Sequence, residues 1–304
     1  MSGALVHTGQ VVLDLVLRVR GLPPVGGDVF ASRSQLLPGG GFNVMAAATR
    51  AGARVVYAGG HGVGHFGDVA RAALAAEGIA VAAPVTLGID TGICVVMVDD
   101  TGERTFVTGS GAEETTDAAV LADVAMGPAD VVYVTGYSLL DAKAEILLER
   151  LEKVTDATVL VDPGPLAAEI DPGTWTRLRA ITTVLSCNAR EARLLTGATD
   201  LRVAAAALAT TLPAGATVIV RDGPAGCLLT RDGTTVTVPG FAVTAVDTNG
   251  AGDAHCGVLA AELLRGVPLA EAALRANAAA AIAVTREGPA TAPTRAEVDA
   301  LLQR

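Results

Sequence analysis

The alternation of hydrophobic and polar residues changes its character near residue 117. Before that point, short runs rich in apolar and β-branched residues predict strands, and two segments predict helices. The strands are expected at Val11–Val19, Val29–Leu37, Ile79–Leu87, Gly92–Val98 and Arg104–Thr108, and the helices at Phe42–Ala51 and Phe66–Glu77. The polar segment from Asp99 to Gly102 predicts a hairpin turn between the last two strands, because Asp and Gly tolerate the dihedral angles of tight turns.

After residue 117, short apolar strands alternate with helices, and the last third of the chain is helical. Strands are expected at Val131–Val134, Thr158–Val161, Thr183–Ser186 and Val218–Val220, and helices at Ala142–Lys153, Ala189–Leu195, Arg202–Thr210, Ala251–Leu264, Leu269–Val284 and Arg295–Leu302. Such alternation is typical of βαβ units, in which helices cover both faces of a parallel sheet. We therefore expect one α/β domain over residues 1–304, a three-layer αβα fold with a mainly parallel central sheet.

The early strands are more numerous than this central sheet needs. We interpret the strands within segments 14–37 and 84–110 as a small additional sheet that forms a lid over a site. The alternative is that they extend the edge of the main sheet.

The composition of the chain limits the kinds of molecule that it can bind. Half of the residues are hydrophobic (51%), so a large core can form, and aromatic residues are few (3%). With 22 basic and 32 acidic residues, the net charge is −10, and we expect neither nucleic acid nor an anionic membrane as a partner. A nucleotide stays possible in principle, because backbone amides and helix N-termini bind phosphate without net positive charge.

The cysteines and the apolar runs indicate a soluble protein of a reducing compartment. Cys94, Cys187, Cys227 and Cys256 lie far apart without metal-binding spacing, and we interpret them as small core residues. The N-terminal residues do not resemble a signal peptide, and no apolar stretch approaches the ~20 residues of a membrane span. We expect a cytoplasmic location.

The most informative stretch runs from Asp247 to Asp253, reads DTNGAGD, and leads into a predicted helix. Small residues at a helix start leave backbone amides open, and the helix dipole adds partial positive charge, so the segment predicts an anion hole. A carboxylate in the first turn can accept a proton from a hydroxyl that attacks a phosphoryl group. The alternative is that Asp253 only favours the helix N-terminus and the glycines only turn the chain.

This string resembles the second signature of the ribokinase-like (PfkB) carbohydrate kinases, Asp-Thr-x-Gly-Ala-Gly-Asp, at every fixed position. The resemblance implies that Asp253 is the catalytic base and that Gly250, Ala251 and Gly252 form the anion hole. It also implies a ribokinase-like fold with a β-sheet lid, and it places a monovalent cation such as K⁺ near Asp247 and Asn249.

Two segments are similar to the family's acceptor site. Residues 38–43 read PGGGFN, which implies that Gly40, Gly41 and Asn43 bind the acceptor, although the family usually has three residues between its Gly pair and the Asn, and here there are two. Asp14, which we place after the first strand, corresponds to an Asp that binds substrate hydroxyls. A Gly-rich turn and an exposed strand-end Asp are the alternatives.

Three further segments resemble the family's nucleotide site. Residues 188–191 read NARE and are similar to the Asn-x-x-Glu motif, which implies that Asn188 binds ATP and that Glu191 holds Mg²⁺ through water; a capping box is the alternative. Residues 221–226 read RDGPAG and resemble the nucleotide loop, with Arg221, Gly223 and Gly226 at the phosphates. Asn277 resembles a position near the adenine.

Other polar residues have less specific interpretations. His255 stands two residues after the base, where it either packs under the helix start or titrates and tunes Asp253. His61 and His65 are too isolated from other ligands for a metal site. Arg104 follows the predicted hairpin turn, and we expect it to be solvated, with substrate contact as the alternative.

The resemblance implies a kinase that uses ATP and Mg²⁺ to phosphorylate a primary hydroxyl of a small sugar or polyol, and we expect a homodimer. A nucleoside kinase is the alternative within the family, with Phe30, Phe42, Phe106 and Tyr137 as candidates for stacking on a base. An NAD-linked oxidoreductase lacks support, because no Gly-x-Gly-x-x-Gly opens the first helix. A non-catalytic nucleotide sensor is the last alternative, and the intact Asp253 argues against it.

Overall fold

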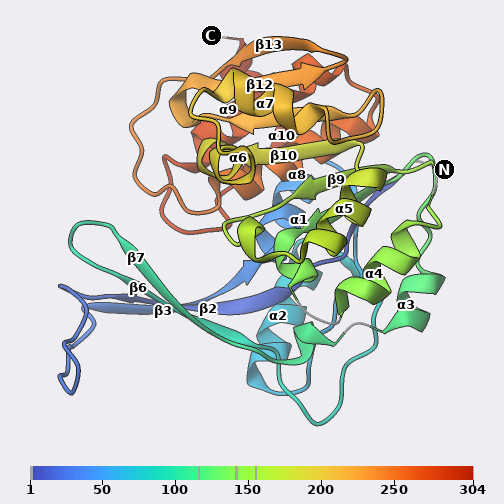
Figure 1. Cartoon of the computed structure of the whole chain (residues 1–304). Coiled ribbons are helices and arrows are strands. Elements are labelled where there is room, and N and C mark those ends of the chain that lie inside the picture. Colours follow the sequence, from blue (N-terminus) through green and yellow to red (C-terminus); the bar gives the residue numbers. More distant parts are fainter. Residues whose placement is uncertain (1–2, 116, 141–142, 155, 304) are drawn as a thin grey trace.

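The computed structural model describes residues 3–115, 117–140, 143–154 and 156–303 and has the expected three layers. The main sheet, sheet A, has nine strands that run parallel except for the hairpin at one edge (Figure 1). Their spatial order is β13 (Thr234–Pro239), β12 (Gly226–Arg231), β11 (Thr217–Arg221), β10 (Val184–Asn188), β9 (Thr158–Asp162), β8 (Val131–Thr135), β1 (Ala4–His7), β4 (Arg54–Tyr57) and β5 (Ala80–Val81).

Neighbouring residues of the sheet A strands belong to different cores, one on each face of the sheet. Leu5 of β1 packs in one core and Val6 in the other, as the period of two in a strand requires. The first core contains residues of α1 (Gly41–Arg50), α2 (His65–Ala76), α8 (Ala251–Leu264) and α9 (Leu269–Ala283), and α10 (Arg295–Leu302) packs on α9. The second contains residues of α3 (Ala118–Asp123), α4 (Lys143–Leu151), α5 (Pro172–Ile181), α6 (Ala189–Thr196) and α7 (Leu201–Ala209).

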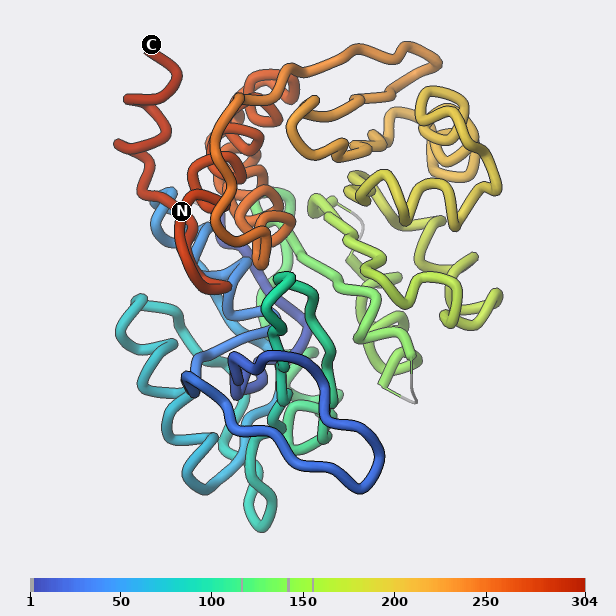
Figure 2. Tube along the Cα trace, turned by 90° about the vertical axis from the view of Figure 1, so that its left-hand side faces the viewer, coloured from blue at the N-terminus to red at the C-terminus, as the bar shows by residue number. Residues whose placement is uncertain are grey.

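A second sheet, sheet B, projects from one side of this body, as the two views show (Figures 1 and 2). Its order is β3 (Arg33–Gly40), β2 (Val11–Arg18), β6 (Ile93–Val98) and β7 (Arg104–Gly109). The strands β2, β3, β6 and β7 therefore form a separate sheet, whereas β5 (Ala80–Val81), within the strand expected at Ile79–Leu87, lies at the edge of sheet A. The predicted turn is confirmed, because Gly102 N donates to Asp99 O at 3.0 Å and closes the β6–β7 hairpin.

Several predicted boundaries were wrong for identifiable reasons. The strand expected at 29–37 begins only at Arg33, and Phe30 before it is 90% exposed. Of the strand expected at 79–87, only β5 forms. The strands β1 and β4 escaped prediction because each has four residues, too few for a periodic pattern. The predicted start of α4 at Ala142 lies outside the described residues.

The hairpin of β12 and β13 and the helix α5 were also missed. Asp232 and Gly233 join the two strands with φ of 48° and 75°, the positive values that a two-residue type I′ turn requires. Within the described residues, no helix is long and apolar enough to cross a membrane.

Candidate active site

The predicted anion hole lies at the start of α8. Gly250 caps this helix with φ of 72°, and a Cβ there would lie 2.0 Å from Pro289 O, so only glycine fits. Of the amides predicted to form the hole, that of Ala251 is engaged, because Ala251 N donates to Thr248 O at 3.4 Å. In the described part of the chain, the amide of Gly252 has no acceptor, and neither has that of Asp253, which was not predicted to contribute one. Two open amides at the positive end of a buried helix form a site for an anion.

Asn43 and Asp253 meet where α1 crosses α8. The crossing is close because α8 has glycine at 257, where a Cβ would lie 2.3 Å from Val44 O. Asn43 Nδ2 donates to Asp253 Oδ2 at 3.0 Å. The other amide atom, Asn43 Oδ1, is buried and has no partner among the described residues. The Asn43 side chain therefore orients the predicted base and still has one acceptor available.

The environment of Asp253 suits a base that works near neutral pH. The pKa of Asp253 is raised to about 6, chiefly by burial. The charge of Asp162 also raises this pKa, whereas the hydrogen bond from Asn43 and the charge of Arg221 lower it. A carboxylate with this pKa is ionised at pH 7 and can still accept a proton from a reacting group.

Asp14 lies in sheet B, on the side of the site where we expect the acceptor. It is not at a strand end, as we expected, but inside β2, between Leu37 and Cys94 of the neighbouring strands. The strand expected at Val11–Val19 forms as β2 and continues past Asp14 to Arg18. The Asp14 carboxylate covers Gly39, where a Cβ would meet Oδ2 at 2.3 Å. Burial raises the pKa of Asp14 to about 7, and the charge of Asp253 adds to the effect.

The glycines before α1 allow its close approach to β1 and β2. Gly40 has φ of 59° and caps α1, and Gly41 N donates to Gln10 O at 2.8 Å. A Cβ on Gly41 would lie 2.1 Å from Cε1 of His7, a buried residue that our sequence analysis did not consider. The Gly-rich turn is thus required by packing, and the same turn brings its backbone beside Asp14 and Asn43.

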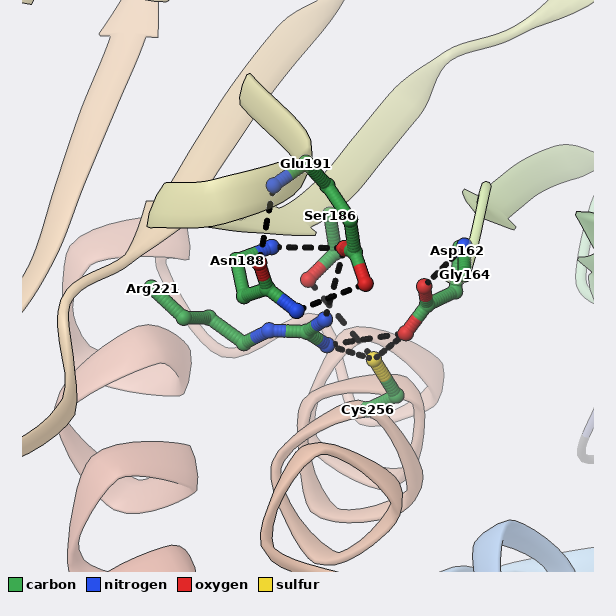
Figure 3. Close-up of polar contacts among 7 residues, drawn as sticks. All are labelled: Asp162, Gly164, Ser186, Asn188, Glu191, Arg221 and Cys256. Atoms are coloured by element: carbon green, nitrogen blue, oxygen red, sulfur yellow. Dashed lines mark hydrogen bonds and ion pairs between the residues drawn. The ribbon is translucent and has the colours of Figure 1, made fainter. Parts of the chain in front are cut away.

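A buried polar cluster lies behind the anion hole at the carboxyl ends of β9, β10 and β11 (Figure 3). Arg221 Nη1 donates to Asp162 Oδ2 at 2.9 Å and lies 2.9 Å from Cys256 Sγ. A Cβ on Gly252 would lie 3.6 Å from the Arg221 guanidinium. The Arg221 guanidinium therefore lies directly behind the anion hole, where Asp162 and Glu191 balance its charge. Asp162 had no place in the predicted site, although it directly follows a predicted strand.

Asn188 and Glu191 form the capping box of α6, the alternative that the sequence left open. Asn188 Oδ1 accepts from Glu191 N at 2.9 Å, while Glu191 Oε2 accepts from Asn188 N at 2.8 Å. Asn188 Nδ2 also donates to Glu191 Oε1 at 2.6 Å, and Arg221 Nη2 lies 3.7 Å from Glu191 Oε2. Asn188 and Glu191 can cap α6 and also belong to the buried polar cluster, because α6 starts at the carboxyl end of β10.

The predicted nucleotide loop lies against the end of β13. Gly223 and Gly226 both have positive φ, 54° and 93°, and a Cβ on Gly226 would lie 2.2 Å from Val238 O. Asn277 Nδ2 donates to Val238 O at 3.2 Å and to Pro239 O at 3.0 Å. The Asn277 side chain therefore braces this region from beneath.

Asp247 contacts sheet B, which the sequence did not indicate. Its Oδ1 pairs with Arg104 Nη2 of β7 and accepts from Asn249 N at 2.8 Å, and its Oδ2 accepts from Gly288 N at 3.1 Å. We had expected Arg104 to be solvated, and this was wrong, because its side chain is held in an ion pair. A cleft beside this pair has both apolar and charged walls, and it is lined by Val16, Arg18, Gln35, Leu37, Val96, Val98, Gly102, Arg104 and residues 245–249 and 287–289.

The remaining candidates are structural. His255 is buried, and burial together with the charge of Arg221 lowers its pKa to about 3, so it packs as a neutral ring under the helix start. The four cysteines are free and buried. The described residues contain no group of three or more His, Cys, Asp or Glu side chains that could hold a metal ion, and His61 instead contacts Ala83 O at 3.0 Å.

Comparison with known proteins identifies the family of the chain. The model of the pfkB family of carbohydrate kinases matches residues 3–295. The chain belongs to the PfkB family. YegV of Escherichia coli K12, an uncharacterized sugar kinase, is 32% identical over 319 aligned residues that cover 98% of each chain. Ribokinase of Haemophilus influenzae is 28% identical, and the alignment covers 98% of this chain and 97% of that protein.

The solved structures confirm the ribokinase-like fold. The crystal structure of ribokinase from Thermotoga maritima superposes with a TM-score of 0.83 at 27% identity, over 99% of each chain. The protein is therefore a kinase of the PfkB family, and the oxidoreductase alternative is excluded.

Proposed function

We propose that this PfkB kinase transfers the γ-phosphoryl group of ATP to a primary hydroxyl of a small sugar or related polyol, with Asp253 as the general base. The observation that carries the proposal is the Asp253 carboxylate beside two open amides at the start of α8. A base and an anion hole on one helical turn can serve the attacking hydroxyl and the transferred phosphoryl group at the same time.

The acceptor would lie between sheet B and α1. Asp14 approaches from β2, and the Asn43 amide retains the unpartnered acceptor Oδ1. A carboxylate and an amide oxygen suit a ligand with several hydroxyl donors. The backbone of Gly40 and Gly41 forms the wall between them.

The nucleotide would lie over the carboxyl ends of β10 and β11, the edge of a parallel sheet where ligands of α/β proteins bind. Gly223 and Gly226 would pass beneath it, and Asn188 and Arg221 would face its phosphates. Arg221 is mostly buried, with 11% of its side chain exposed, so it acts chiefly through its charge behind Gly252. Asn277 supports the adenine region from beneath the loop.

The residues present fit Mg²⁺ only through a water molecule bound to the ion. Both oxygens of Glu191 accept from Asn188, at 2.6 and 2.8 Å, but a carboxylate has about four acceptor sites. Glu191 can therefore accept from a metal-bound water without giving up its cap. Mg²⁺ that arrives with ATP would neutralise phosphate charge, as this ion usually does with few carboxylates and several waters.

The residues do not fit the expected monovalent cation at Asp247 and Asn249. Both oxygens of the Asp247 carboxylate accept from N–H donors, and one of them belongs to the charged guanidinium of Arg104. K⁺ therefore has no part in the proposed catalytic step.

The proton transfer follows from the residues of the chain alone. Asp14 and Asn43 orient the acceptor, and Asp253 takes the proton of the attacking hydroxyl on its carboxylate. The Gly252 and Asp253 amides stabilise the phosphoryl oxygens, and Arg221 adds charge behind them. One well-placed donor of this kind contributes about 2.7–4 kcal/mol to transition-state stabilisation in oxyanion holes.

We also propose that the protein is a homodimer and that sheet B forms part of the interface. The support is that β7 exposes five of its six residues, among them the large apolar Phe106 and Val107. Light scattering of the purified protein tests this, and a monomeric mass at micromolar concentration would contradict it.

An acceptor panel in a coupled ADP-release assay tests the proposed function. We expect ADP release with one or a few sugars or polyols and none with Asp253→Asn. A response to nucleosides alone would point to stacking on Tyr137, which is 42% exposed and whose pKa is raised by burial and by Asp253. Phe42 is buried and cannot stack on a base. No acceptor-dependent release from any compound would contradict the proposal.

A further inference from the structure

The ion pair between Arg104 and Asp247 joins sheet B to the loop that precedes the anion hole. Arg104 is the first residue of β7, and its side chain is 21% exposed, while that of Asp247 is 12% exposed. The two residues lie 143 positions apart in the sequence, and their contact joins sheet B to the loop that precedes α8. A mostly buried pair of this kind is strongly directional, because a guanidinium donates to carboxylate oxygens in fixed geometry.

Asp247 is also the residue that organises the anion-hole loop. Its Oδ1 accepts from Asn249 N, next to Gly250, and its Oδ2 accepts from Gly288 N. Gly288 precedes Pro289, whose carbonyl oxygen packs directly against Gly250. Both sides of the turn at Gly250 are therefore tied to one carboxylate, and the charge that neutralises this carboxylate comes from Arg104.

We propose that Arg104 is a positioning residue whose guanidinium, from sheet B, takes the place of a monovalent cation at Asp247. The family resemblance predicts such a cation there. Two consequences follow. The kinase works without K⁺, and the loop at Gly250 reaches its full order only when sheet B is closed. The role in turnover rests on the proposed function, whereas the contact and its cation dependence do not.

The other arginines of sheet B provide a matched control. Arg18 and Arg33 both pair with Glu287, at 2.8 and 3.0 Å, but these side chains are 43–50% exposed and Asp247 is not involved. Exposed pairs of this kind contribute little to stability. Arg18→Gln therefore removes one arginine of sheet B without changing the charge at Asp247.

The test compares wild type, Arg104→Gln, Arg104→Lys and Arg18→Gln in KCl and in tetramethylammonium chloride at equal ionic strength. The first readout is the melting temperature of the protein without substrate. We expect no K⁺-specific change for wild type, Arg104→Lys and Arg18→Gln. For Arg104→Gln we expect K⁺, at about ten times its Kd, to raise the melting temperature by roughly 2–4 °C, because Asp247 is then free to bind it.

The second readout is turnover with an active acceptor. Arg104→Gln should lose about tenfold or more in kcat without K⁺ and recover with it, while Arg18→Gln stays within about twofold of wild type in both salts. K⁺-specific stabilisation of the wild-type protein would overturn the proposal, and so would an Arg104→Gln variant that ignores K⁺ in both readouts. If the proposed function fails, the melting temperatures still decide the inference.

Discussion

The two sheets of this kinase are held in different ways, and the catalytic groups are divided between them. In sheet A, β1 buries all four of its residues and β8 buries four of five. In sheet B, β7 exposes five of six residues, and Cys94, Val96 and Val98 form a small buried cluster of their own. Sheet A packs on both faces, whereas sheet B joins the main body through Val11 and Leu13 at the start of β2 and through the ion pairs of three arginines.

This difference separates two tasks of the site. Asp253, the open amides and Arg221 belong to the buried layers, so the chemistry rests on groups that need little reorganisation when the substrates bind. Asp14 belongs to sheet B, so we expect the proposed grip on the acceptor to open and close with this sheet. A phosphoryl-transfer site has to exclude water during the reaction, and a sheet that closes over the acceptor would provide such a cover.

The largest expected effect tests the rigid half. Asp253→Asn preserves the size of the side chain and removes the base, and we expect kcat to fall by about 10²- to 10⁴-fold while ATP affinity changes little. Calorimetric titration with ATP and steady-state turnover provide the measurement. Asp100→Asn, at the exposed hairpin turn of sheet B, is the matched control and should behave as wild type. Near-normal kcat in Asp253→Asn would remove the base assignment.

A change in sheet B should act on the acceptor alone. Asp14→Ala removes the carboxylate that faces the acceptor hydroxyls, and an unpaired buried hydroxyl costs about 1–3 kcal/mol, so acceptor affinity should fall by roughly ten- to hundredfold. ATP affinity should stay within about twofold, since no nucleotide group is expected near β2. Equal losses for both ligands in calorimetry would mean that Asp14 supports the fold rather than the acceptor.

The pH dependence of turnover should reveal the charge behind the anion hole. Asp253 must be ionised to act, and its pKa is about 6, so kcat/KM should fall as the pH drops through 6–7. Asp14, with a pKa of about 7, contributes to the same acid limb of the profile. The apparent pKa values of this limb therefore belong to the pair of carboxyl groups. Arg221 lowers the pKa of Asp253. Arg221→Met should therefore move the acid limb to higher pH, while Arg221→Lys should leave it nearer the wild-type position. An unchanged limb in Arg221→Met would show that the guanidinium does not act on the base.

The smallest expected effect concerns the motion of sheet B. We predict that acceptor binding increases the hydrogen-exchange protection of amides in residues 92–108, across β6 and β7, because the sheet closes over the ligand. Strands of sheet A, such as β9, should be slow to exchange in both states, since their amides are buried in the ladder. Protection that rises around Asp14 but not in residues 92–108 would show that sheet B is no lid.

The sequence predicted the buried half better than the exposed half. Strands β8 to β11 and helices α8 to α10 were found because their apolar pattern is set by burial on both faces or along one side. Sheet B was recognised as separate, but β3 starts four residues later than predicted, since exposed residues such as Phe30 imitate the composition of a strand. Asp14 was expected at a strand end, although the apolar pattern of the predicted strand continues past it, as β2 does to Arg18.

Within the site, motifs with a local physical cause were found, and contacts that depend on the tertiary structure were not. The Gly250 turn and the Asn188–Glu191 box are local, and their strings reveal them. The pairing of Arg104 with Asp247 and of Arg221 with Asp162 joins residues 143 and 59 positions apart, and only the assembled layers create it. The carboxyl ends of adjacent parallel strands were the one available signal for Asp162.

The central claim is that Asp253 directs the γ-phosphoryl group of ATP to a primary hydroxyl of a small polyol. The most direct measurement is phosphorus–proton correlation NMR of the product formed with the acceptor that gives the highest ADP release. We predict a phosphate ester that correlates with the two protons of a CH₂–O group, in an amount equal to the ADP formed, and no product with Asp253→Asn. An ester on a secondary carbon, or inorganic phosphate as the only new phosphorus signal, would contradict the account.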